Sequence, residues 1–165
     1  MADKKYILDR ATAERKLRRM AYEIVESNVD EPALILAGIE ENGVVIAKQI
    51  QRMLAEISTI KTELISISLD KRHPTSITVS NETDFNKKAI ILIDDVANSG
   101  KTLLYALKPF LEFYPKKIQV LVLVERTHKA FSIRPDYVGV SLSTTIQEHI
   151  FVEVAAGEVM GAWME

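Results

Sequence analysis

The residues best suited to chemistry lie between Ile90 and Leu103. Four apolar residues are followed by the acids Asp94 and Asp95 and then by the small or polar residues Val96, Ala97, Asn98, Ser99, Gly100, Lys101 and Thr102. Adjacent carboxylates can accept hydrogen bonds from two vicinal hydroxyls, and a turn entering a helix presents N–H groups to an anion. The hydroxyls of Ser99 and Thr102 add further donors. This one segment therefore has the groups needed to hold both ends of a ribose 5-phosphate.

Two other interpretations of the segment are open. Residues 99–102 are similar to the end of a nucleotide-binding P-loop, but that motif needs a glycine where this chain has Asp95. The two acids could instead form a solvated turn. Acids that directly follow a buried apolar run are costly unless they are hydrogen-bonded, which counts against a merely structural turn.

The elements that must position this segment alternate along the chain. Asp9 is a predicted cap for a helix that extends to about Asn28, and helices are also predicted over 44–57 and 101–113. Strands are predicted over 33–38, 62–69, 77–80, 89–93, 118–124, 137–142 and 150–154. Apolar strands that alternate with helices favour a parallel sheet covered on both faces, in which ligands lie at the carboxyl ends of the strands.

Composition places the chain among ordinary globular proteins. Its 165 residues are 47% hydrophobic and 27% charged, which predicts one domain over residues 1–165. The absence of cysteine excludes disulfides, thiolate metal sites and a cysteine nucleophile. Three scattered histidines predict no metal site. No apolar run is long enough for a membrane span and the start lacks a signal peptide, so a cytoplasmic protein is expected.

Charge is distributed unevenly. The net charge is −2, but residues 1–20 carry seven basic and three acidic side chains while residues 21–70 carry three basic and nine acidic ones. A strong nucleic-acid binder usually shows a basic stripe, and this chain has only a small basic patch near its start. Composition therefore counts against RNA as a partner without excluding it.

The segment from Ile90 to Leu103 resembles the motif with which type I phosphoribosyltransferases bind phosphoribosyl pyrophosphate (PRPP). Residues 7–9, Gly38 with its loop, 124–128 and 133–139 are similar to one branch, the pyrimidine operon regulator / uracil phosphoribosyltransferase family. The likeness covers about residues 6–155. It implies an α/β fold in which a parallel sheet is flanked by helices and carries a small hood region.

The resemblance also implies a role for each matched residue. Asp94 and Asp95 would bind the ribose hydroxyls, residues 97–102 the 5-phosphate, and Arg126 would act in catalysis near the base and pyrophosphate. Tyr137 would stack on the base while the Val138 backbone reads its edge. Mg²⁺ would arrive with the pyrophosphate, so no protein ligand is assigned to it. The reaction would transfer ribose 5-phosphate from PRPP to a nucleobase, with uracil the leading candidate, in a homodimer.

One loop departs from the family pattern. Where relatives usually have Thr-Arg-Gly to hold pyrophosphate, this chain has Glu40, Glu41, Asn42 and Gly43. Like unit charges ~4 Å apart repel by about 4 kcal/mol at an effective dielectric constant near 20. Bound Mg²⁺ would offset this repulsion, and the side chains of Glu40 and Glu41 could instead point to solvent. Residues 71–88 correspond to the family's mobile loop, which closes over the site. Lys71, Arg72 and His73 could supply charge on closure, but we favour the interpretation that they are solvated loop residues without a function.

Three functions follow from these observations. The first is a Mg²⁺-dependent phosphoribosyltransferase. The second is an RNA-binding regulator of the same fold, for which Arg15, Lys16, Arg18 and Arg19 are the support. The third is a sensor that binds PRPP or a nucleotide without turnover, a reading motivated by the acidic loop.

Overall fold

The computed structural model describes residues 4–145 and 147–165. In chain order its elements are β1 (Lys5–Asp9), α1 (Arg10–Ser27), β2 (Ala33–Ile39), α2 (Asn42–Ile57), β3 (Lys61–Leu69), β4 (Ile77–Val79), β5 (Ala89–Ala97), α3 (Lys101–Ala106), α4 (Lys108–Leu111), β6 (Lys117–Arg126), β7 (Tyr137–Leu142), β8 (Ile150–Ala155) and β9 (Glu158–Met164).

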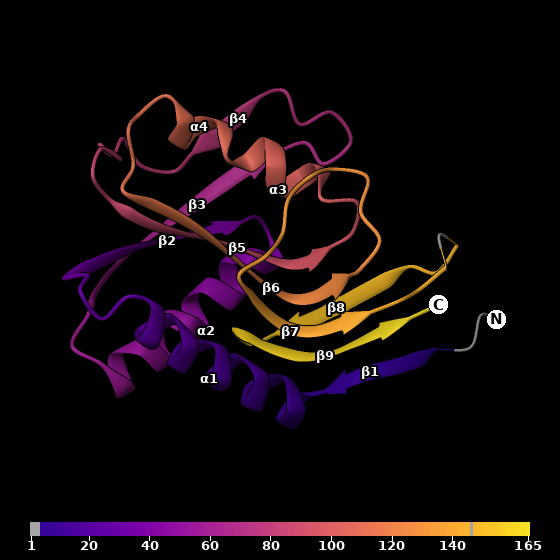
Figure 1. The fold of residues 1–165 in the computed structure, drawn as a ribbon. Coiled ribbons are helices and arrows are strands. Elements are labelled where there is room, and N and C mark those ends of the chain that lie inside the picture. The colour runs from indigo at the N-terminus through magenta and orange to yellow at the C-terminus, as the bar shows by residue number, and fades with distance from the viewer. Residues whose placement is uncertain (1–3, 146) are drawn as a thin grey trace.

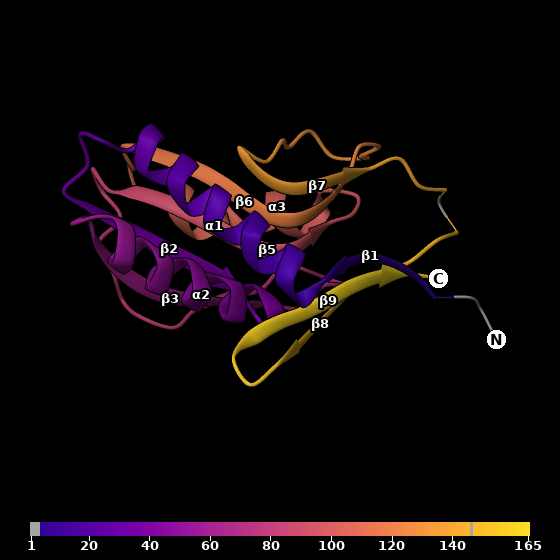
Figure 2. The ribbon, with the colours of Figure 1, turned by 90° about the horizontal axis from the view of Figure 1, so that it is seen from below.

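A six-stranded sheet forms the centre of the molecule, with strand order β4-β3-β2-β5-β6-β7. All neighbours pair in parallel except β4, which runs antiparallel at one edge. Helices α1 and α2 lie on one face of the sheet, and α3 and α4 lie on the other (Figures 1 and 2). This arrangement confirms the predicted type I phosphoribosyltransferase-like architecture.

Both faces of the central strands are buried, which explains their nearly continuous apolar sequences. Leu36 and Ile91 pack with α1 and α2, whereas Ile35 and Leu92 pack on the opposite face with α3 and α4. The alternation follows from the two-residue period of a strand. Two cores therefore hold the sheet between them.

Helix α1 begins as the sequence predicts. The Asp9 side chain accepts a hydrogen bond from the Thr12 N–H at 2.7 Å, which satisfies one of the free donors of the first turn. The apolar face predicted at helical spacing is buried and consists of Ala13, Leu17, Met20, Ala21 and Ile24.

A second, smaller sheet is the hood. Its strands are β1, β9 and β8, all antiparallel, so the two ends of the chain lie side by side (Figure 1). Strands β1 and β9 are not predicted by the sequence analysis. In β1 only Leu8 is buried, and the adjacent Gly161 and Ala162 break the alternation of β9, so neither segment shows a strong two-residue pattern.

Two predicted boundaries are wrong in informative ways. The helix expected over 101–113 is divided at Leu107 into α3 and α4, because Pro109 has no N–H to continue the ladder. Strand β5 extends through the two acids to Ala97 instead of ending at Ile93. Asp94 and Asp95 therefore lie in the strand itself. None of the described helices is both long and apolar enough to cross a membrane.

Candidate functional site

The candidate site lies where the strand order reverses. From β2 the chain proceeds to β3 on one side, whereas β5 lies against β2 on the other side. Loops that leave two such strands diverge and open a crevice at the carboxyl ends of the strands, where ligands bind in open α/β sheets. Here the crevice separates residues 40–43, which follow β2, from the carboxyl end of β5 and the turn after it.

The paired acids are held in different environments. Asp94 is only 1% exposed, and its Oδ1 accepts a hydrogen bond from the Asp95 N–H at 2.9 Å. Asp95 is partly buried, with Oδ1 accepting from the Val96 N–H at 2.8 Å and Oδ2 accepting from Asn42 Nδ2 at 2.9 Å. Both carboxylates are thus held in fixed orientations by the surrounding backbone and side chains. A pair of carboxylates that binds two hydroxyls needs such fixed orientations.

Burial is the main cause that raises the pKa of Asp94 well above its usual range, and the neighbouring Asp95 carboxylate raises it further. The Lys71 ammonium acts in the opposite direction, with Nζ 3.9 Å from Asp94 Oδ1. This buried acid excludes the solvated acidic turn as an interpretation of the segment.

The turn after β5 is fixed by its neighbours. Gly100 has a φ of 87°, a left-handed conformation, and a Cβ at this position would lie 2.8 Å from Ile133 Cγ2. The Ser99 carbonyl accepts hydrogen bonds from the N–H groups of Ala130 and Phe131 at 3.1 and 3.0 Å. The chain then enters α3, and the first turn of a helix leaves N–H groups without intrahelical partners. The turn is therefore rigid and offers donors to an anion.

Two adjoining cavities open beside the acids. One, of about 190 Å³, is lined by residues 94–103 together with Lys71 and Ile150. The other, of about 320 Å³, is lined by Glu40, Glu41, Asn42, Lys71 and Asp95. Because Lys71 and Asp95 line both, the two cavities meet at these side chains. One ligand with a group at each end could occupy both.

The acidic loop is tied closely to the end of β5. A Cβ on Gly43 would lie 2.6 Å from the Ile93 carbonyl oxygen and 3.3 Å from Asp94 Oδ1, so only glycine fits there without a shift. Asn42 Nδ2 donates to Asp95 and also to the Val152 carbonyl at 3.0 Å. Asn42 therefore joins the loop, β5 and the hood.

Arg126 is brought beside the turn after β5 by four hydrogen bonds to protein groups. Its Nε donates to Asn98 Oδ1 at 2.9 Å, and its Nη1 donates to the Thr144 hydroxyl at 2.6 Å and to the Thr145 carbonyl at 3.0 Å. Its Nη2 donates to the Glu148 carbonyl. This geometry joins Asn98 to Thr144, Thr145 and Glu148, and the catalytic role of Arg126 stays a prediction.

Tyr137 and Val138 line neither of the two cavities, and their base contacts stay a prediction. The Tyr137 ring is 2% exposed, and its hydroxyl donates to Gln119 Oε1 at 2.7 Å. The pairing of β7 with β6 and of β6 with β5 places Tyr137 level with Ile93, but its ring packs in the core on the α1 face of the sheet. The Val138 carbonyl accepts from Arg19 Nη2 at 2.9 Å, so this backbone group already has a partner.

The sequence analysis did not assign Lys71, Ile150 and Val152 to the site. Lys71 follows the end of β3, the neighbour of β2, so a signal for the strand order, which the sequence analysis did not predict, would have been needed to place it. Ile150 and Val152 belong to β8, whose approach to the site depends on pairing with the unpredicted β9.

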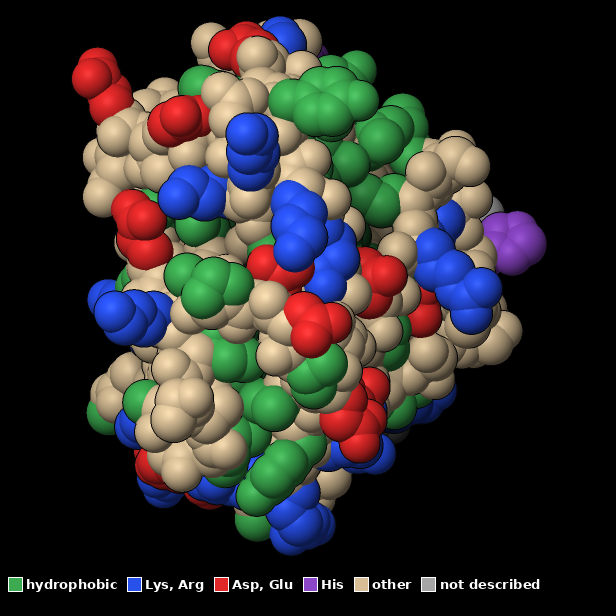
Figure 3. All heavy atoms as spheres, turned by 60° about the vertical axis from the view of Figure 1, so that its left-hand side comes forward, with side chains coloured by type: hydrophobic (Ala, Val, Ile, Leu, Met, Phe, Trp, Pro, Cys, Tyr) green, Lys and Arg blue, Asp and Glu red, His purple; other side chains and the backbone are tan. Residues whose placement is uncertain are grey.

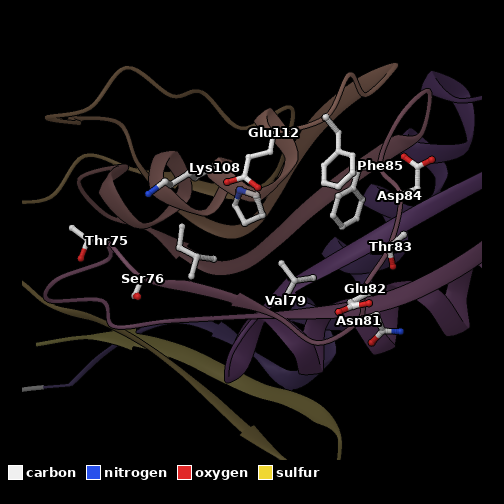
Figure 4. A pocket seen from close by; sticks show the side chains of 13 residues that line it. Thr75, Ser76, Val79, Asn81, Glu82, Thr83, Asp84, Phe85, Lys108 and Glu112 are labelled. Atoms are coloured by element: carbon white, nitrogen blue, oxygen red, sulfur yellow. The ribbon is translucent and has the colours of Figure 1, made fainter.

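A larger hollow lies elsewhere. It has a volume of about 700 Å³ and lies between edge strand β4, the segment after it and α4 (Figure 4). Its walls include Phe85, Phe113 and Glu112, and it shares no lining residue with the two cavities beside Asp95. It lacks the paired acids and the turn between β5 and α3, so its size alone does not make it the functional site.

Three of the four basic residues that supported an RNA-binding interpretation, all in α1, have partners within the fold. Arg15 donates to Thr12, Arg18 pairs with Glu56, and Arg19 pairs with Glu23 and donates to the backbone of β7. On the face seen in Figure 3, Lys and Arg side chains lie among Asp and Glu side chains instead of forming a continuous basic surface.

Comparisons with known proteins agree with this geometry. The phosphoribosyl transferase domain family matches residues 4–156. The chain is 36% identical to the "Bifunctional protein PyrR" of Caldicellulosiruptor bescii, over 91% of this chain and 88% of that protein. It is 33% identical to the protein of the same name from Limosilactobacillus fermentum, over 90% of this chain and 89% of that protein.

Among solved structures, the chain is similar to a hypoxanthine-guanine phosphoribosyltransferase of Bacillus anthracis. The TM-score is 0.75 over 96% of both chains, at 16% identity. A hypoxanthine phosphoribosyltransferase of Trypanosoma cruzi gives a TM-score of 0.76 over 95% of this chain and 90% of that one, at 10% identity. The fold, the motif at the end of β5 and the sequence relatives agree, and the chain belongs to the phosphoribosyltransferase family, in the branch of the proteins named PyrR.

Proposed function

We propose that this protein transfers ribose 5-phosphate from PRPP to a nucleobase and releases pyrophosphate. The observation that carries the proposal is the pair of cavities that meet at Asp95, one beside the anion-binding turn and the other beside the loop after β2. PRPP has a phosphate at C5 and a pyrophosphate at C1 of the same ribose. Its two anionic ends match the two cavities, and its hydroxyls match the acids between them.

Each part of the site has a task in this proposal. The carboxylates of Asp94 and Asp95 accept hydrogen bonds from the ribose hydroxyls, while the N–H groups and hydroxyls of residues 97–102 bind the 5-phosphate. Displacement at C1 breaks the bond to the pyrophosphate oxygen and forms a bond to a base nitrogen. Positive charge develops on the ribose ring, so carboxylates fixed beside it contribute positioning and electrostatic stabilisation.

Mg²⁺ dependence is part of the proposal. Among the described residues no three acids or histidines lie close enough together to hold a metal ion by themselves, but the carboxylate of Asp95 lines the second cavity. One such carboxylate fits Mg²⁺, which often binds through one or two carboxylates together with substrate phosphates. When bound, the ion would neutralise charge on the departing pyrophosphate.

Uracil is the proposed base. The support is the resemblance of the sequence to the uracil phosphoribosyltransferase branch, and the base contacts of Tyr137 and Val138 stay a prediction.

Two other functions remain as alternatives. A sensor that binds without turnover is motivated by the acidic loop. An RNA-binding regulator is the function that the resemblance to the pyrimidine operon regulator branch allows. Of its four supporting residues, Arg15, Arg18 and Arg19 are engaged within the fold, and Lys16 alone gives little support.

An assay of pyrophosphate release tests the proposal directly. The protein is incubated with PRPP, Mg²⁺ and each of uracil, hypoxanthine and guanine, and the nucleotide product is identified by mass spectrometry. We expect uridine 5′-monophosphate to form with stoichiometric pyrophosphate. Binding of PRPP without product from any base would support the sensor. A filter-binding series with RNA at low salt that shows no affinity would exclude the regulator, because phosphate contacts are strongest there.

A further inference from the structure

Asn42 joins three parts of the molecule through one nitrogen atom. It is the first residue of α2, directly after the loop that follows β2, and it lines the second cavity together with Asp95. Its Nδ2 donates to Asp95 Oδ2 at 2.9 Å and to the Val152 carbonyl at 3.0 Å. An amide nitrogen carries two hydrogens, so these two bonds use both of its donors. The same amide group therefore holds the acid at the end of β5 and a strand of the hood.

Strand β8 has few polar links to the rest of the molecule. It lies at the edge of the three-stranded hood sheet, and its buried face packs on the core through Ile150 and Val152. Among the described residues, the bond from Asn42 to Val152 is the only side-chain hydrogen bond made to β8. Another bond between α2 and the hood is made to β9, where the Val159 N–H donates to Gln49 Oε1 at 3.1 Å. Asn42 is thus the polar side chain that fixes β8 relative to the site.

The bond to Asp95 places this link beside the proposed ligand. Asp95 Oδ1 accepts from the Val96 N–H and Oδ2 accepts from Asn42, but each carboxylate oxygen has two lone pairs and keeps one for a ribose hydroxyl. A hydroxyl bound there restricts rotation of the carboxylate and, with it, the amide of Asn42. Strand β8 is close enough to the ligand to respond, because Ile150 lines the first cavity.

We infer that Asn42 is a positioning residue that couples the ribose site to the hood: when a ribose hydroxyl binds Asp95, the Asn42 amide is held against Val152 and β8 opens less often. This inference rests on the proposed function, because it places ribose on Asp95. Coupling between two sites is reciprocal, so an ordered β8 also favours the orientation of Asp95 that binds ribose. Asn42 acts through Asp95 and is assigned no contact with the reacting atoms.

Variants that differ in their number of donors separate this coupling from a merely structural contact. Asn42→Gln keeps both amide hydrogens, Asn42→Ser has one hydroxyl hydrogen for two acceptors, and Asn42→Leu has none. The matched control is Asn81→Ser, at an exposed residue that lines neither of the two cavities. Calorimetry first gives the affinity of each protein for ribose 5-phosphate. Every protein is then compared at the same multiple of its dissociation constant, so that ligand binding stabilises each fold equally.

The deciding measurement is hydrogen exchange of the β8 amides, followed by NMR with and without ribose 5-phosphate. In the wild type and in Asn81→Ser, we expect the ligand to slow this exchange by about tenfold, within the usual range of coupling between sites. Asn42→Gln should keep most of the slowing. In Asn42→Ser and Asn42→Leu the slowing should fall below about twofold, although ribose 5-phosphate still binds.

The possible failures have different signatures. Equal slowing of β8 in the wild type and in Asn42→Ser, or a wild type that binds ribose 5-phosphate without slowing of β8, would overturn the inference and leave the ribose site standing. Complete loss of ribose 5-phosphate binding in Asn42→Ser would also overturn it, because Asn42 would then hold the ligand itself. Asn42→Ser decides the question if Asn42→Leu does not fold. A wild-type protein that does not bind ribose 5-phosphate would instead refute the proposed function.

Discussion

The loops on either side of Asp95 are both closely fitted to the fold, but they differ in charge. The turn after β5 is made of small and hydroxyl-bearing residues, and it is pinned through Gly100 and the Ser99 carbonyl. The loop after β2 is just as closely fitted, with Gly43 against Ile93 and Asn42 joined to Asp95. This loop, however, carries the negative charges of Glu40 and Glu41, which the turn after β5 does not have. The comparison shows that two loops of one site can be equally closely fitted to β5 while only one of them carries acidic side chains beside its cavity.

The strongest test of this comparison is removal of the acid that both cavities share. Asp95→Asn replaces a charged hydrogen-bond acceptor, and each such bond contributes about 1.5–3 kcal/mol. We expect ribose 5-phosphate and PRPP to bind about 10- to 100-fold more weakly by calorimetry. Glu26→Gln, on the exposed side of α1, is the control and should bind normally. Unchanged binding in Asp95→Asn would show that the ribose lies elsewhere.

The close fit of the acidic loop is tested by Gly43→Ala. The added Cβ would lie 2.6 Å from the Ile93 carbonyl oxygen, so the loop or β5 must move. We expect the free energy of unfolding to fall by about 1–3 kcal/mol, which corresponds to a melting temperature lower by about 2–4 °C for each 1 kcal/mol. Thermal unfolding with an unchanged midpoint would mean that the two loops are not in contact.

The buried acid of β5 predicts a pH dependence of stability. The pKa of Asp94 is raised in the folded protein above its ordinary value of 3.8, so the folded state binds this proton more tightly than the unfolded chain. The contribution of Asp94 to stability is therefore full below pH 3.8 and is lost as pH rises through its folded pKa. Each pKa unit by which the folded and unfolded states differ changes the free energy of unfolding by about 1.4 kcal/mol.

Asp94→Asn should accordingly melt at a higher temperature than the wild type near pH 7, and the difference should shrink as the pH is lowered toward 4. Scanning calorimetry between these pH values measures it. A variant that is less stable than the wild type at pH 7 would show that the Asp94 carboxylate is stabilised by its ion pair with Lys71 more than it is destabilised by burial.

The smallest expected effect concerns a residue outside both loops. Tyr137→Phe removes a hydroxyl that donates to Gln119, so unfolding should become easier by about 1 kcal/mol while nucleotide affinity stays the same. Chemical denaturation and a titration with uridine 5′-monophosphate check the two parts. A tenfold loss of affinity at unchanged stability would restore the predicted base contact.

Local sequence signals predict the sheet and the turn after β5. Apolar runs such as 89–93, the cap at Asp9 and the glycine before α3 each act over a few residues, so their patterns are readable without knowledge of tertiary contacts. The hood and Lys71 depend on long-range pairing. Strand β1 joins β9 from the other end of the chain, and Lys71 reaches Asp94 only because β3, β2 and β5 are neighbours.

Tyr137 is a different case. Its aromatic ring in a family-like motif suggested a stacking surface, but aromatic rings also fill cores, and the hydroxyl has partners at Gln119 and Asn28. Sequence alone does not distinguish these uses, because the burial of the ring depends on its packing against α1 in the core on that face of the sheet.

The central claim is that one site, at the end of β5, holds a ribose 5-phosphate group. The most direct test is a titration of ¹⁵N-labelled protein with ribose 5-phosphate, followed by amide chemical shifts. The account predicts saturable shifts for residues 95–102, with little change at the 700 Å³ hollow beside β4. Shifts confined to that hollow, around Val79 and Phe85, or no saturable shifts at residues 95–102, would contradict it.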